Sequence, residues 1–135
     1  MNGQSKIQAG AGKDAMTGPL FLIGFMGVGK SSIAARLGQL LGVPAREMDD
    51  YIEEKVGLSI PEIFDQRGEA FFREVESATV AELGSQGPQV ISCGGGVPMR
   101  QENVDCMRAC GVIVLLTATP ETIFQRVRHN ENRPL

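Results

Sequence analysis

Residues Gly24 to Ser31 have the spacing with the clearest chemical meaning in this chain. They read Gly-Phe-Met-Gly-Val-Gly-Lys-Ser, which fits the pattern G-x-x-x-x-G-K-[S/T] of a phosphate-binding loop. Glycines let the backbone turn tightly and direct its N–H groups at phosphate oxygens, and the start of a following helix adds partial positive charge. Lys30 can reach the β- and γ-phosphates of a nucleotide, and the Ser31 hydroxyl can bind Mg²⁺. The alternative is a glycine-rich turn that binds no ligand.

A second group of polar side chains consists of the carboxylates of Glu47, Asp49 and Asp50. They come just after a predicted short strand near 45–48, and residues two apart at a strand end share a face. Glu47 and Asp49 are therefore expected to point at one site, where they could orient Mg²⁺ or accept a proton from a substrate hydroxyl. Asp50 is expected to point elsewhere, because a solvated helix start also favours an acid at this position.

Two further features stand out. Gly94-Gly95-Gly96 directly follows a predicted buried strand, and three glycines in a row suit a backbone that must approach a ligand closely. The alternative is an ordinary loop. Arg73 lies on a predicted long helix, where the plain alternative to a binding role is a surface ion pair with Glu76, three residues further on.

The elements that would hold these groups alternate between strands and helices. We predict strands over 20–24, 45–48, 89–93 and 112–117, and helices over 30–41, 49–55, 68–83, 101–109 and 120–128, with another helix starting near 59. The apolar run Val112 to Leu116 is expected to be a buried strand. This order predicts an α/β fold, a three-layer parallel sheet with helices on both faces. Ligands of such sheets bind beyond the carboxyl ends of the strands, which places all three polar segments at one edge.

The ends of the chain read differently from the rest. Residues 1–18 have few apolar side chains and no period, which predicts a disordered leader or tag before a single domain over 19–135. The leader also lacks the apolar core of a signal peptide. The last residues, 130–135, follow the final predicted helix without forming an element. Arg133 in this loop could fold over a nucleotide and stabilise charge on a transferring phosphoryl group.

The composition limits the partners of the chain. A formal net charge of −3 gives no reason to expect nucleic acid or an anionic membrane, and no apolar stretch is long enough to span a membrane. Cys93, Cys106 and Cys110 are an odd number of cysteines without paired spacing, which is typical of reduced thiols in the cytoplasm. A metal at Cys106 and Cys110 would need further ligands.

Taken together, these segments resemble the shikimate kinase family. The resemblance rests on G-F-M-G-V-G-K-S at 24–31, E-M-D at 47–49, S-I-P-E-I-F at 59–64, G-E-A-F-F-R at 68–73, G-G-G at 94–96 and R-P-L at 133–135. A phosphate loop alone occurs in many nucleotide enzymes, whereas this combination is much more specific. The resemblance implies a monomeric, cytoplasmic P-loop kinase of the nucleoside-monophosphate-kinase type. Such an enzyme uses ATP and Mg²⁺ to phosphorylate the 3-hydroxyl of shikimate, on the route to chorismate and the aromatic amino acids.

The resemblance also implies roles for individual residues. Those expected to hold the nucleotide phosphates are Gly27, Val28, Gly29, Lys30, Ser31, Ser32 and Arg133. Ser31 and Glu47 would face Mg²⁺. Those expected to contact shikimate are Asp49 on its hydroxyls, Arg73 on its carboxylate, and Gly94, Gly95 and Gly96 through the backbone. Lys30, Asp49 and Arg133 would form the catalytic set, with Asp49 placed to take the proton and Arg133 on a mobile lid.

This chain departs from the family pattern in two ways. The family usually has Asp-x-Asp where this chain has Glu47-Met48-Asp49, and the longer side chain alters the metal geometry there. The family also continues beyond Leu135 with the rest of the lid, a second arginine for the shikimate carboxylate, and a last strand and helix. We therefore expect a fold that is incomplete at the C-terminus. Purified residues 1–135 should show weak or no turnover with ATP and shikimate.

Two other functions fit part of the pattern. One is another small-molecule kinase, such as a gluconate-kinase-like enzyme, which a substrate panel would distinguish. The other is a non-catalytic nucleotide-binding module, against which intact Lys30, Ser31, Asp49 and Arg73 argue. A guanine-reading Asn-Lys-x-Asp motif is absent, which argues against a GTPase switch.

Overall fold

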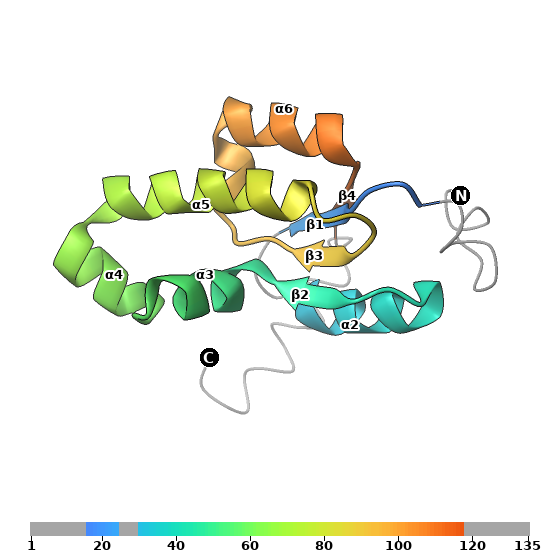
Figure 1. The fold of residues 1–135 in the computed structure, drawn as a ribbon, viewed down its shortest axis with the longest axis horizontal. Coiled ribbons are helices and arrows are strands. Elements are labelled where there is room, and N and C mark those ends of the chain that lie inside the picture. Colours follow the sequence, from blue (N-terminus) through green and yellow to red (C-terminus); the bar gives the residue numbers. More distant parts are fainter. Residues whose placement is uncertain (1–15, 25–29, 118–135) are drawn as a thin grey trace.

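The computed structural model describes residues 16–24 and 30–117 (Figure 1). Its elements, in chain order, are β1 (Leu20–Gly24), α2 (Lys30–Leu41), β2 (Ala45–Glu47), α3 (Met48–Val56), α4 (Ile60–Arg67), α5 (Glu69–Gly84), β3 (Val90–Ser92), the 3₁₀ turn η2 (Val97–Met99), α6 (Gln101–Cys110) and β4 (Val112–Leu116). The predictions for residues 1–15, for the loop at 25–29, and for the helix and loop beyond 117 fall outside the described residues.

The four described strands form one parallel sheet in the order β2-β3-β1-β4. In the register of the sheet, Phe21 of β1 pairs with Ile91 of β3 on one side and Ile113 of β4 on the other. Neighbouring parallel strands need crossovers, and the helices supply them. The predicted parallel α/β sheet is therefore confirmed.

Alternation along the strands gives each face of the sheet its own core. On one face, Phe21 and Ile91 pack with buried side chains of α3, α4, α5 and α6. On the other face, Leu20, Leu22 and Val90 pack with α2. Figure 1 shows α2 on one side of the sheet and the long helix α5 with α6 on the other. The three-layer arrangement with helices on both faces is therefore confirmed.

The run from Val112 to Leu116 forms a strand, as predicted, but the expectation that it is buried is wrong. In the described part of the chain β4 lies at an edge of the sheet and pairs only with β1. Val112 and Leu115 are 59% and 58% exposed. An apolar run predicts a strand, but burial also depends on neighbours that the run itself does not encode.

Local signals fix the helix boundaries before the long helix α5. Gly57 ends α3 in the left-handed conformation that favours glycine. Ser59 then begins α4 with a capping box, in which its hydroxyl accepts the Glu62 N–H and the Glu62 carboxylate accepts the Ser59 N–H. No helix of the described residues combines the length and apolarity needed to cross a membrane.

The junction between α4 and α5 depends on Gly68. Its φ of 90° and ψ of 165° lie in a backbone region open almost only to glycine. Its N–H donates to the carbonyl oxygens of Ile63 and Phe64, and its own carbonyl accepts the Phe72 N–H. Gly68 therefore sets the direction in which α5 begins. Because α5 carries Arg73, Gly68 also sets the direction from which Arg73 reaches the sheet edge.

We therefore expect Gly68→Ala to lower the free energy of unfolding by about 1–3 kcal/mol, the usual range for a strained backbone position. Urea denaturation followed by circular dichroism measures this. Gly57→Asn is the matched control, since asparagine tolerates the left-handed conformation of Gly57 and should cost little. Equal stability losses in the two variants would contradict this interpretation.

Candidate active site

The carboxyl ends of three strands bring the predicted polar segments to one edge of the sheet. In the chain, β1 is followed by the glycine loop and then by α2. Likewise, β2 is followed by α3, and β3 is followed by the triple glycine. Lys30, the first residue of α2, donates from Nζ to the carbonyl oxygen of Gly24 at 3.0 Å. The N-terminus of α2 and the Lys30 ammonium thus face the same edge, which suits an anionic ligand.

Asp49 belongs to the first turn of α3, in agreement with the helix predicted over 49–55, whereas the strand predicted over 45–48 is one residue too long. β2 stops at Glu47 because the helical conformation begins at Met48. The side chain nevertheless reaches the neighbouring strand end: a Cβ atom added to Gly94 would stand 3.0 Å from Asp49 Oδ1. A glycine at position 94 therefore leaves room for this carboxylate. Asp50 is exposed, as expected.

The electrostatic setting of Asp49 supports its place in a shared site. Burial raises the pKa of Asp49, and the negative charges of Glu47, Glu53 and Asp50 raise it further. The positive charge of Lys30 opposes them, which places this ammonium within electrostatic reach of the carboxylate. The ionised Asp49 carboxylate therefore takes up a proton more readily than an ordinary aspartate does.

This pKa shift predicts how stability depends on pH. A carboxyl whose pKa is higher in the folded than in the unfolded chain stabilises the fold at low pH, and this stabilisation is lost as pH rises through the folded pKa. Asp49→Asn removes the ionised group, so we expect a higher thermal midpoint than the unaltered protein at pH 8 and a difference that disappears below about pH 3.5. Asp50→Asn is the control, because an exposed acid in the first helical turn is favourable and its loss should not stabilise. A lower midpoint for Asp49→Asn at pH 8 would contradict the prediction.

Arg73 lies against the third glycine of the loop after β3. A Cβ atom added to Gly96 would stand 2.9 Å from Arg73 Cζ and closer still to Nη1. The guanidinium carbon also lies 5.2 Å from the ring centroid of Phe72 and 6.0 Å from that of Phe64. Only glycine fits between this side chain and the turn. Asp49 and Arg73 therefore contact opposite ends of the same three-glycine segment.

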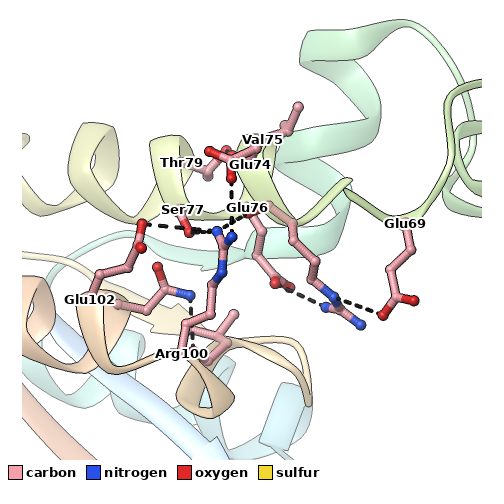
Figure 2. Close-up of polar contacts among 11 residues, drawn as sticks. Glu69, Glu74, Val75, Glu76, Ser77, Thr79, Arg100 and Glu102 are labelled. Atoms are coloured by element: carbon pink, nitrogen blue, oxygen red, sulfur yellow. Dashed lines mark hydrogen bonds and ion pairs between the residues drawn. The ribbon is translucent and has the colours of Figure 1, made fainter. Parts of the chain in front are cut away.

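The ion pair of Arg73 with Glu76 forms, but it is not the surface pair that the sequence suggests. Arg73 Nη1 donates to Glu76 Oε1 at 2.9 Å, and the Glu76 side chain is only 1% exposed. A weaker pair joins Arg73 Nε to exposed Glu69 at 3.5 Å (Figure 2). The pKa of Glu76 is raised, because the effect of burial exceeds the lowering effect of the hydrogen bond from Arg73. Among the described residues no acceptor is found for Arg73 Nη2, so this guanidinium nitrogen can donate to an anionic ligand.

Glu76 was missed as a site residue, although the sequence holds a signal. Phe72, Glu76, Thr79 and Leu83 are all buried and recur at helical spacing on α5. A carboxylate on this apolar face requires a partner, because an unpaired buried charge is costly. Arg73, one turn earlier, is that partner.

The remaining predicted site residues divide into two groups. Ser31 and Ser32 lie exposed in the first turn of α2, where they can meet a ligand of the glycine loop. Gly27, Val28, Gly29 and Arg133 lie outside the described residues. No group of three or more His, Cys, Asp or Glu side chains that could hold a metal is found in the parts described, 16–24 and 30–117. The available hydroxyl and carboxylate oxygens fit Mg²⁺, which keeps several waters and shares phosphate oxygens instead of requiring an all-protein cage.

Comparison with known proteins identifies the family to which this site belongs. The family model described as "Shikimate kinase" matches residues 26–135. A shikimate kinase of Dehalococcoides mccartyi is 43% identical over 114 residues, which cover 84% of this chain and 65% of that protein. One of Paracidovorax citrulli is 42% identical over 125 residues, covering 89% and 68%. The chain thus spans about two thirds of the length of these curated relatives.

Solved structures agree with this result. The shikimate kinase from Acinetobacter baumannii in complex with shikimate has a TM-score of 0.77 and 34% sequence identity, covering 94% of this chain and 70% of that one. A gluconokinase from Sinorhizobium meliloti has a TM-score of 0.52 at 18% identity, which shows a shared fold alone. The P-loop kinase fold is confirmed, and the resemblance to shikimate kinases is confirmed as membership.

Proposed function

The chain belongs to the shikimate kinase family, and we propose that it acts in the ATP-dependent phosphorylation of the 3-hydroxyl of shikimate. The observation that carries this proposal is the arrangement around the triple glycine. A carboxylate, Asp49, stands at Gly94, and a guanidinium, Arg73, stands at Gly96. A small ring with hydroxyls on one side and a carboxylate on another would meet matching groups at both ends.

Each polar group would have a distinct task. Arg73 would bind the shikimate carboxylate through Nη2, because a planar guanidinium matches a carboxylate in geometry and charge. Asp49 would accept a hydrogen bond from the reacting hydroxyl and then its proton. The raised pKa of Asp49 favours that proton transfer. Backbone groups of Gly94, Gly95 and Gly96 would contact the ring at close range.

The nucleotide would occupy the neighbouring edge of the site. Lys30 would leave the Gly24 carbonyl and bind the phosphates of ATP together with Ser31, Ser32 and the loop residues Gly27, Val28 and Gly29. Ser31 and Glu47 would help to hold Mg²⁺, whose chemistry would be to neutralise charge on the phosphate oxygens. Arg133 would add a positive charge over the transferring phosphoryl group.

The cellular setting follows as part of the same proposal. A monomer in the cytoplasm, with no nucleic-acid or membrane partner, would suit a chain of net charge −3 that recognises a small anion locally.

A substrate panel tests the proposal. The protein is assayed as the organism makes it, and release of ADP from ATP is measured with shikimate, with gluconate and with no acceptor. We expect turnover with shikimate and only slow background hydrolysis in the other two. Preference for gluconate, or the same rate with every acceptor, would refute the proposed activity.

A further inference from the structure

Arg100 connects the loop over residues 94–100, which begins with the triple glycine, to helix α5. Arg100 stands between η2 and α6, and its Nη1 donates to the carbonyl oxygen of Arg73 at 3.2 Å and to Ser77 Oγ at 2.8 Å. Its Nη2 forms an ion pair with Glu74 at 3.0 Å. Figure 2 shows this guanidinium between the side chains of Glu74, Ser77 and Glu102. Arg100, at the end of this loop, is therefore bonded to the backbone of Arg73, the residue whose side chain lies against Gly96.

A buried amide side chain on α6 also bonds this loop. Asn103, on the first turn of α6, is 1% exposed and donates from Nδ2 to the carbonyl oxygen of Val97 at 3.0 Å. Within the loop, the Val97 N–H donates to Gly94 and the Met99 N–H donates to Gly96. Residues 94–100 thus form a continuous hydrogen-bonded turn, anchored at Val97 by Asn103 and at its end by Arg100.

This anchoring fixes a distance that the site depends on. Gly96 lies too close to the Arg73 guanidinium to accept a side chain, and Gly94 lies similarly close to Asp49. If the loop moved away from α5, its backbone would separate from the guanidinium that faces it. Among the described contacts, Arg100 bonds Arg73 at its main-chain carbonyl and not at the guanidinium that would meet a ligand.

We infer that Arg100 is a positioning residue for the acid-binding half of the site. This inference rests on the proposed function: by holding the loop at 94–100 on α5, Arg100 sets the spacing between Arg73 and the glycine backbone that the substrate carboxylate needs. Its ion pairs with Glu74 and Glu102 are exposed and contribute little. The bonds that matter are those to the Arg73 carbonyl and to Ser77.

A purely structural role makes a different prediction. α5 and α6 also pack through apolar side chains such as Val80 and Met107, so the fold does not depend on Arg100 alone. If Arg100 only stabilised the fold, its loss would lower the thermal midpoint and weaken the binding of both ligands together. If it positions the acid-binding half, shikimate binding should weaken while ATP binding and the thermal midpoint change little.

The test compares Arg100→Gln with the unaltered protein by isothermal titration calorimetry with shikimate and with ATP. We expect the Kd for shikimate to rise about tenfold, the loss typical of a charge-assisted hydrogen bond, and the Kd for ATP to stay within about twofold. Arg108→Gln is the matched control, because Arg108 is an exposed arginine in the last turn of α6, and it should change neither value. Ser77→Ala, which removes one acceptor, should raise the Kd for shikimate by a smaller factor and decides the question if Arg100→Gln does not fold.

The outcomes separate the two proposals. An unchanged Kd for shikimate in both variants, or a joint loss of both ligands with a lower thermal midpoint, would overturn the positioning role alone. An unaltered protein that binds ATP but no shikimate would refute the proposed function, and the positioning role with it.

Discussion

Arg73→Met is expected to raise the Kd for shikimate by about 30-fold or more and to leave the Kd for ATP nearly unchanged. Removing one partner of a desolvated charge pair costs about 2–5 kcal/mol, and each 1.4 kcal/mol is about tenfold in affinity. Isothermal titration calorimetry with each ligand measures both effects. Equal losses for shikimate and ATP, or no loss for shikimate, would contradict the assigned role.

The same substitution should also destabilise the fold, so it needs a second variant. Methionine would leave the buried Glu76 carboxylate without its partner, and removing one member of a buried pair typically costs about 3–5 kcal/mol. The double variant Arg73→Met with Glu76→Gln removes the unpaired charge and should recover much of the stability. It should not recover shikimate binding. Recovery of both would show that Arg73 serves the fold and not the ligand.

Lys30→Met is expected to lower kcat by about 100- to 1000-fold, the usual effect of losing one group that stabilises transition-state charge. Lys30 is the first residue of α2, and in the described structure its side chain bonds only the Gly24 carbonyl. The fold should therefore tolerate the loss of the Lys30 ammonium group. The measurement is the steady-state rate of ADP release at saturating ATP and shikimate.

Arg36→Met provides the control for charge on the same helix, because Arg36 is exposed six residues further along α2. Its kcat should remain within about twofold of the unaltered protein, as is usual for surface positions. A similar loss of rate in both variants would mean that net charge, not the placement of Lys30, governs the reaction.

Much of the fold could be predicted because its signals are local. β1 and α2 begin and end at the predicted residues, since an apolar strand, a glycine loop and a periodic helix follow one another without ambiguity. The capping box at Ser59 and the left-handed Gly57 place α3 and α4 in the same way. The convergence of the polar segments followed from topology, because carboxyl ends of parallel strands meet at one edge.

Other features depend on contacts distant in sequence and could not be predicted. The exposure of β4 depends on which strands flank it in the sheet. The approach of the Asp49 carboxylate to Gly94 depends on how the start of α3 packs beside the segment that follows β3. Arg100 lies 27 residues from Arg73 in sequence, and no motif around it distinguishes it from a surface arginine. Only the fold brings its guanidinium to the Arg73 carbonyl.

The most direct test of the account is whether the two ligands bind side by side. Mn²⁺, a paramagnetic substitute for Mg²⁺, is bound with ADP, and the NMR relaxation of the shikimate protons is then measured. We predict that the proton on carbon 3, beside the reacting hydroxyl, relaxes faster than the methylene protons on carbon 6, and that Arg73→Met abolishes the effect. Equal relaxation of the two positions, or no enhancement when both ligands are bound, would show that the carboxylate-binding arginine and the phosphate-binding lysine do not serve one cavity.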